Sequence, residues 1–243
     1  MSLPTPSSPL PPGLRNPAYR TITNPTVHDR AHFTQYASED PSAPYTLVTI
    51  TQEPGGAIPL HFHRHVVETF SVLKGALGVH LAGTQHLLQA GETLHVLTGN
   101  VHRFYNPGAE DVTFQVAVEG TATDLPTRVA QAEGFEKILY IVYGLAHDGM
   151  VWSDGMPRNP LYLSVVAHLR DTNIAWAGGF LVAGLMRGLG FAAWMAGSEE
   201  WLVERYWTRW GENMNWIDNC DCALDEADED LFAACTGYLL IYM

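Results

Sequence analysis

The stretch GGAIPLHFHRHVVETFSVLKG, residues 55–75, decides how this chain is organised. Alternate side chains of a β-strand share a face, so the pair His61 and His63 is expected to point in one direction. Glu68 then begins a second run of apolar residues that alternate as in a strand. Imidazoles and carboxylates are side chains with which proteins hold divalent transition metals. Residues 55–75 therefore predict two neighbouring strands that present metal-binding groups.

A second stretch, GETLHVLTGNVHRFYN at residues 91–106, adds one more imidazole. His102 follows the turn signal Gly99-Asn100, which could bring a further strand back beside the first two. Three imidazole nitrogens and one carboxylate suit a divalent transition metal that keeps open positions for water, dioxygen or substrate. The predicted metal ligands are His61, His63, Glu68 and His102.

These two stretches resemble the two sequence motifs of the cupin family. The first motif is matched at every spacing by Gly55, His61, His63, Glu68 and Gly75. The second is matched by Gly91, Gly99, His102 and Asn106. Leu97 stands where the family usually has proline, a departure that concerns the stiffness of the loop and leaves the ligand set intact.

The resemblance implies a mainly β fold, a cupin or jelly-roll β-barrel, over residues 19–122. The pattern of the chain favours the same fold, because many short β-patterned runs alternate there with glycine and proline turns. The resemblance also implies one divalent metal per chain, which could be iron, manganese, nickel, copper or zinc, since no second H-x-H motif is present. A barrel of this kind can enclose a small ligand.

Strand parity predicts which side chains face the inside of that barrel. The predicted substrate pocket is lined by Phe70, Val72, Phe104 and Phe114. His65 shares parity with His61 and His63 but falls where the two strands are connected. It is a candidate pocket acid/base or substitute ligand, because histidine titrates near neutrality, and the alternative is a solvated loop residue. Glu68 is the second candidate catalytic group, as an acceptor of a substrate proton.

The remaining chain divides into three further segments. Residues 1–18 are rich in proline and serine and predict a disordered or extended arm. Residues 123–210 carry helical periodicity and predict a helical C-terminal extension packed on the exterior of the barrel. Residues 211–243 form an acidic tail whose structure the pattern does not decide.

Within the extension, residues 174–197 are apolar and rich in glycine. Arg187 leaves an apolar run shorter than the ~20 residues that a membrane-spanning helix needs. A helical cover or a dimer contact is the main interpretation, and a helix lying at a membrane interface is the alternative. Since the extension has a large apolar surface, we expect a homodimer.

The composition excludes several classes of partner. Twenty-six acidic against 13 basic side chains argue against nucleic acid and anionic membranes. The three cysteines, Cys220, Cys222 and Cys235, form no disulfide framework, and we expect a cytoplasmic protein.

Two classes of function fit this pattern. The first is a metal-dependent enzyme that acts on an apolar, aromatic or polyketide-like small molecule. Dioxygenase chemistry is slightly favoured within this class, as a weak resemblance to quercetinase-like dioxygenases implies, over redox-neutral isomerisation, decarboxylation or cyclisation. The second is a non-catalytic cupin that binds a small ligand. Retention of all four metal ligands favours the enzyme.

Overall fold

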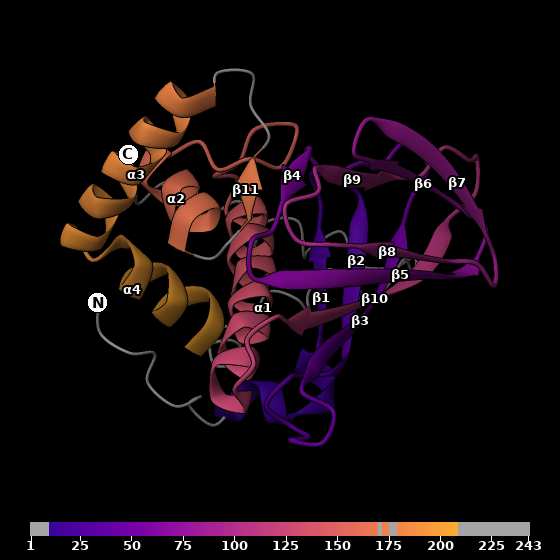
Figure 1. Ribbon diagram of the computed structural model, residues 1–243, viewed down its shortest axis with the longest axis horizontal. Helices are drawn as coiled ribbons and strands as arrows, with labels where there is room; N and C mark the ends of the chain where they lie inside the picture. Colours follow the sequence, from indigo (N-terminus) through magenta and orange to yellow (C-terminus); the bar gives the residue numbers. More distant parts are fainter. Residues whose placement is uncertain (1–9, 170–171, 175–178, 209–243) are drawn as a thin grey trace, which may run out of the picture. The chain divides into compact units, whose positions relative to one another are not determined.

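Two antiparallel sheets make up the barrel of this protein in a computed structural model that describes residues 10–169, 172–174 and 179–208 (Figure 1). The six-stranded sheet comprises, in spatial order, β1 (Thr21–Asn24), β2 (Asp29–Gln35), β3 (Tyr45–Gln52), β10 (Val112–Gly120), β5 (Val66–Lys74) and β8 (Thr93–Val96). The five-stranded sheet comprises β11 (Asn173–Ile174), β4 (His61–Phe62), β9 (His102–Tyr105), β6 (Ala76–Leu81) and β7 (Thr84–Gln89). The predicted mainly β jelly-roll fold is confirmed.

The space between the sheets is filled by an aromatic cluster of Phe70, Phe104 and Phe114. Their ring centroids lie 5.0–6.2 Å apart, at tilted or edge-to-face angles that aromatic pairs prefer. The cluster forms because β5 and β10 bury every second residue and pair directly with each other, with Phe114 opposite Val72. The parity predicted from the sequence is therefore correct for these strands.

The first described residues form short helical turns, whereas the sequence predicted a disordered or extended arm. Two 3-10 turns, η1 (Pro12–Arg15) and η2 (Pro17–Tyr19), lead into β1. Leu14 is fully buried, and Asn16 caps η2 by accepting a hydrogen bond from the amide of Ala18. A single apolar side chain among prolines therefore anchors this part of the arm, which composition alone did not indicate.

The extension after the barrel begins with the longest helix, α1 (Leu125–His147). Asp124 is its N-cap and accepts a hydrogen bond from the amide of Thr127, and Gly149 with φ +65° follows its end. The remaining helices are α2 (Pro160–Ser164), the π-helical segment η3 (Val165–Leu169), α3 (Gly179–Met195), α4 (Ser198–Val203) and the π-helical segment η4 (Glu204–Thr208). Asn159 is the N-cap of α2, and its side chain accepts a hydrogen bond from the amide of Leu161.

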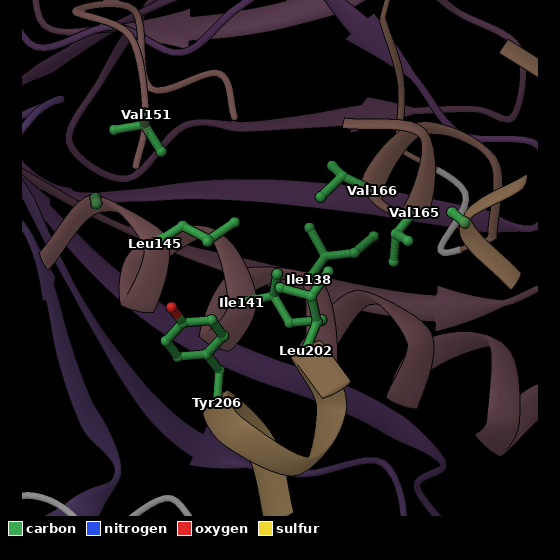
Figure 2. Packing of buried hydrophobic residues seen from close by; sticks show 10 residues of the cluster. Ile138, Ile141, Leu145, Val151, Val165, Val166, Leu202 and Tyr206 are labelled. Atoms are coloured by element: carbon green, nitrogen blue, oxygen red, sulfur yellow. The ribbon is translucent and has the colours of Figure 1, made fainter. Parts of the chain in front are cut away.

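A second hydrophobic core joins these helices to one another (Figure 2). Its α1 members, Ile138, Ile141 and Leu145, pack against Leu202 and Tyr206 from the end of the described chain. Val151, Val165 and Val166 close the other side of the cluster. The helical extension therefore has its own apolar core, which accounts for the high hydrophobic content of this half of the chain.

The sequence predicted helices that cover the exterior of the barrel. The helices of the structure have a larger role than this. α1 stands between the strands and the other helices, and its first turns lie against β10 (Figure 1). Strand β11 leaves the extension and pairs with β4, where Asn173 lies opposite Phe62. Barrel and extension thus share both a sheet and a helix interface. The described residues, 10–169, 172–174 and 179–208, belong to one compact unit.

Helix α3 holds most of the segment 174–197 that the sequence left ambiguous. It exposes Leu185, Phe191, Trp194 and Met195, each about 60% accessible or more. Among the described residues, no helix is both long enough and apolar enough to cross a membrane. The predicted acidic tail at 211–243 and its three cysteines lie outside the described residues.

A fully buried carboxyl, Glu136, ties α1 to the six-stranded sheet. Its Oε1 atom accepts hydrogen bonds from the Thr46 hydroxyl and from the Ala37 amide, while Oε2 has no partner. Burial raises the pKa of Glu136 to about 8, although both hydrogen bonds act in the opposite direction. The carboxyl is therefore neutral in the folded protein at pH 7.

Glu136→Gln is expected to flatten the dependence of stability on pH. The pKa of Glu136 in the folded protein is raised above its ordinary value of 4.5. The contribution of the protonated carboxyl to the free energy of unfolding is therefore complete below pH 4.5 and is lost as the pH rises through about 8. Between these two pH values, the free energy of unfolding of the wild type should fall by on the order of 3–5 kcal/mol more than that of the variant. Urea unfolding at pH 5.5 and pH 9 measures the difference; parallel curves for the two proteins would show that Glu136 is ionised in the folded state.

Candidate functional site

The four predicted metal ligands lie together in the barrel, all of them buried. Each offers one nitrogen or oxygen atom, and these four atoms lie within 4.8 Å of one another. His61 is on β4 and His102 lies directly opposite it on β9, so the five-stranded sheet supplies this pair. Glu68 comes from β5 in the other sheet. The cluster therefore lies between the two sheets, and the barrel fold itself assembles it.

Backbone carbonyls fix the orientation of two of the imidazoles. Nδ1 of His61 lies 3.0 Å from the carbonyl oxygen of Pro59, and Nδ1 of His102 lies 2.9 Å from that of Asn100. A carbonyl can only accept, so Nδ1 is the protonated nitrogen in both rings. Since Nδ1 faces a carbonyl in both rings, Nε2 is the atom that each ring can offer to a metal.

Glu68 and His102 direct their atoms toward a shared space. Oε2 of Glu68 and Nε2 of His102 are 2.6 Å apart, yet neither atom is in the geometry of a hydrogen bond. Nε2 of His63 lies 3.6 Å from the same carboxylate oxygen. Buried polar atoms without hydrogen bonds are costly, and a cation between them would satisfy both.

The protonation states also fit a metal. Burial raises the pKa of Glu68, but the neighbouring imidazoles of His63 and His102 outweigh burial and lower this pKa to about 2. Burial and the neighbouring His102 lower the pKa of His61 to about 3. An ionised carboxylate and a neutral imidazole are the forms that coordinate metals. The four residues could thus hold one divalent metal ion.

The turn before His102 forms without the proline of the family motif. Gly99 has φ +79°, a conformation that favours glycine, and its amide donates to the carbonyl of His63 at 2.7 Å. Leu97 is exposed in the same turn. The departure at Leu97 therefore leaves the ligand geometry intact, as predicted.

A cavity of about 120 Å³ opens directly onto the ligand cluster, and His61, His63 and Glu68 form part of its wall. Cavities of about 150 Å³ with apolar walls hold molecules the size of benzene. A larger hollow of about 530 Å³ shares Ile58 and Pro59 with this cavity. The site can thus receive a molecule about the size of one aromatic ring, with room outside for substituents.

The walls of the cavity come from both parts of the chain. From the barrel, the apolar lining residues include Ile50, Ile58, Phe104 and Val116. From α1, they are Phe135, Ile138, Leu139 and Val142. The loop of residues 154–157 closes the cavity further, and there Gly155 lies against Val27. The helical extension is therefore part of the site, which sequence parity within the barrel could not reveal.

Three of the four predicted pocket residues lie elsewhere. Phe104 lines the cavity, whereas Phe70, Val72 and Phe114 do not and instead fill the barrel core. Phe70 nevertheless supports the site, because its ring centroid lies 6.2 Å from that of His102. The alternation along a strand predicts which side chains face inward, but it does not predict how deep the cavity extends. Phe70, Val72 and Phe114 face inward but do not line the cavity.

The structure does not bring His65 to the cavity. β4 ends at Phe62, so the alternation that linked His65 to His61 and His63 does not continue. His65 is exposed, and its carbonyl accepts a hydrogen bond from the amide of Thr121. His65 thus lies outside the cavity lining, and its role as a pocket acid/base or substitute ligand stays a prediction.

Two polar residues that the sequence reasoning missed do line the cavity. Asp29 is on β2, whose residues alternate between buried and exposed, and it lies on the buried face. Tyr143 is on α1 and is also buried. An aspartate on the buried face of a strand was the available signal in the sequence.

The comparisons with known proteins agree with the barrel. The family model of the cupin domain matches residues 48–119, which contain all four ligands. No curated protein matches this sequence significantly.

Several solved structures are similar to part of this chain. They include the cupin domain of Cnp3 from Schizosaccharomyces pombe, with 19% identity, a TM-score of 0.34 and coverage of 40% of this chain and 65% of that one. The cupin domain of an XRE family transcriptional regulator from Enterobacter cloacae has 18% identity, a TM-score of 0.33 and coverage of 37% and 94%. A predicted oxalate decarboxylase from Thermotoga maritima has 17% identity, a TM-score of 0.38 and coverage of 42% and 95%.

At these identities and TM-scores the solved structures carry no argument about activity. The assignment of a cupin domain rests on the match of the family model to residues 48–119. The sheets and the ligand cluster that this segment forms agree with it. Residues 48–119 of this chain therefore match a cupin domain.

Proposed function

We propose that this protein is a metal-dependent enzyme that acts on a small, apolar molecule carrying oxygen atoms, with dioxygenase chemistry as the favoured class. The observation that carries the proposal is the position of the ligand cluster in the wall of an apolar cavity. A metal that serves only to stabilise a fold is enclosed by its ligands, whereas this cluster adjoins a space for substrate. We keep His61, His63, Glu68 and His102 as the proposed ligands.

A divalent transition metal bound there would polarise a substrate oxygen and, if redox-active, would support reaction with dioxygen. The residues of the chain provide substrate binding and the exclusion of water. The apolar side chains from the barrel and α1 exclude water and bind the carbon skeleton through buried surface. Dioxygen is itself apolar, so the same lining favours its entry. Iron and manganese are the working metals we expect, although nickel, copper or zinc can occupy such sites.

A redox-neutral reaction is the second candidate, favoured by the buried carboxyl of Asp29 in the same cavity. An isomerase, decarboxylase or cyclase needs a group that moves protons and does not need dioxygen.

We expect turnover of one or more members of a panel of phenols, catechols and β-diketones by protein reconstituted with iron(II) or manganese(II). Each reaction is run with dioxygen and anaerobically, and product masses are recorded. Dependence on dioxygen, with its oxygen atoms in the product, supports the oxygenase. Unchanged anaerobic turnover without oxygen incorporation would replace it by the redox-neutral enzyme. Tight binding of a panel member without turnover would indicate a non-catalytic ligand-binding protein.

A further inference from the structure

The cavity is lined by two carboxyls outside the ligand cluster, those of Asp29 and Asp154, and only that of Asp29 is buried. The residue is 7% exposed, and its Oδ1 atom has no hydrogen-bond partner. It lines the same cavity as His61, His63 and Glu68. A buried carboxyl oxygen without a partner is costly in a core that serves only stability, so its place on a cavity wall indicates a bound polar group.

The hairpin of β1 and β2 holds Asp29 in place. Asn24, directly opposite Asp29 in the pairing of the two strands, is buried. Its side-chain oxygen accepts hydrogen bonds from the amides of Thr26 and Val27, at 3.0 and 3.3 Å. The turn is thus fixed by a buried side chain, and Asp29 lies on a strand rather than on a loop.

Tyr143 reaches Asp29 from the other side of the cavity. Its hydroxyl hydrogen-bonds to the Asp29 carboxyl, so helix α1 and strand β2 meet at this pair. Burial, with the nearby Asp29, raises the pKa of Tyr143 well above its ordinary value of 10. The phenol therefore remains protonated and acts as a donor across the whole working range of pH.

We propose that Asp29 is the proton acceptor for a hydroxyl group of the substrate and that Tyr143 is the residue that positions it. This inference rests on the proposed function, because it assigns a role in the same cavity. In the step, Oδ1 of Asp29 forms a bond to the proton while the substrate O–H bond breaks. The electron pair stays on the substrate oxygen, which becomes anionic, so no redox partner is needed. Of the other two carboxyls of the cavity, Glu68 would be occupied as a metal ligand, and Asp154 is exposed to solvent.

The expected pH dependence follows from the environment of Asp29. Burial raises its pKa to about 7, and the hydrogen bond from Tyr143 acts in the opposite direction. The other titratable groups of the cavity are His61, His63, Glu68 and Asp154. A second hollow that Asp29 also lines contains His28, Arg30, Glu53 and Asp111. Burial and Tyr143 are the two influences on the pKa of Asp29, so a base at this position becomes active as the pH rises through about 7.

Asp29→Asn tests the proposal in two independent measurements, with Glu136→Gln as the matched control. Both variants convert a buried carboxyl with a raised pKa into an amide, but Glu136 lies outside the cavity. The first measurement is calorimetric binding of catechol, whose hydroxyl groups stay protonated near neutral pH, to the metal-free protein. We expect wild type and Glu136→Gln to bind this neutral probe more tightly above pH 7 than below it, because the ionised Asp29 carboxylate accepts a hydroxyl proton of the probe. Asp29→Asn should lose this dependence and bind at least about 10-fold more weakly at pH 8.

The second measurement is the pH profile of turnover by the metal-loaded protein. Asp29→Asn should lower kcat by about 10²–10⁴-fold with normal metal content, as expected for loss of a general base. Tyr143→Phe should shift the rising limb of the profile to higher pH, because the donor that stabilises the carboxylate is gone; a merely structural role would not move it. Asp29→Glu, which keeps the carboxyl, should restore part of the activity.

The outcomes separate this inference from the proposed function. If no compound is turned over by any protein, the proposed function fails, and the binding measurement still decides the role of Asp29. Binding and pH dependence in Asp29→Asn that match Glu136→Gln would overturn the proposal. Turnover by Asp29→Asn within a factor of three of wild type, with an unchanged pH profile, would overturn it as well.

Discussion

His102→Ala is expected to reduce the affinity of this protein for iron(II) or manganese(II) by at least about 100-fold. Even partners of metal ligands change affinity by 10–100-fold when removed, so loss of a ligand itself should cost more. His102 is fully buried, and its Nε2 lies 2.6 Å from the carboxylate oxygen of Glu68. No solvent-exposed side chain can take its place. Titration of the metal-free protein, followed by elemental analysis after gel filtration, measures the effect.

The control for this experiment is His86→Ala. His86 is on β7, opposite Val79, and is not among the clustered ligands. Its replacement should leave the metal content near that of wild type. Because His102→Ala could disturb packing, Glu68→Gln is the second test, since it keeps the size of the side chain while removing the charge. Normal metal content in both ligand variants would show that the metal binds elsewhere.

Gly120→Ala is expected to destabilise the protein by about 3 kcal/mol, the upper part of the range for overpacking. Gly120 ends β10 where the barrel meets α1, and an added Cβ would lie 2.2 Å from the backbone oxygen of Arg128. The helix backbone cannot move there without disturbing two contacts. The Arg128 guanidinium donates to the carbonyl of Ala122, and the Ala122 amide donates to Gln131. Urea unfolding followed by circular dichroism measures the change.

Gly134→Ala, in the middle of α1, is the matched control. An added Cβ at Gly134 meets nothing within 4 Å, and alanine favours a helix over glycine by ~1 kcal/mol. We therefore expect a small stabilisation from the same chemical change. Equal effects of the two substitutions would contradict the close approach of α1 to the barrel at Gly120.

The sequence predicted the part of the site that local geometry determines. The H-x-H spacing on a strand and the turn at Gly99 leave little freedom for His61, His63 and His102, and their clustering with Glu68 is confirmed. The inward parity of β5 and β10 also needs only the period of two of a strand. These features depend on neighbours in the chain or in the pairing of adjacent strands.

The missed features depend on contacts between distant segments. The wall formed by α1 brings Tyr143 to Asp29, residues separated by more than a hundred positions in the chain. The pairing of β11 with β4 involves two residues that lie inside a stretch read as helical. No periodicity within one segment reports on such a contact. The depth of the cavity likewise depends on where α1 meets the barrel, which is why Phe70 and Phe114 were placed in its lining.

The role of α3 stays a prediction. Its exposed residues, among them Phe191 and Trp194, are consistent with a second copy of the chain as the partner, as the sequence led us to expect. Sedimentation of the purified protein at several concentrations distinguishes a dimer from a monomer.

The most direct test of the account is the metal content of the wild-type protein after reconstitution. Metal-free protein is incubated anaerobically with iron(II) or manganese(II), passed through a desalting column and analysed for metal and protein. Four converging ligand atoms at one place in the barrel predict close to one ion per chain. Protein that retains no ion with either metal would contradict the assignment of this cluster as a metal centre.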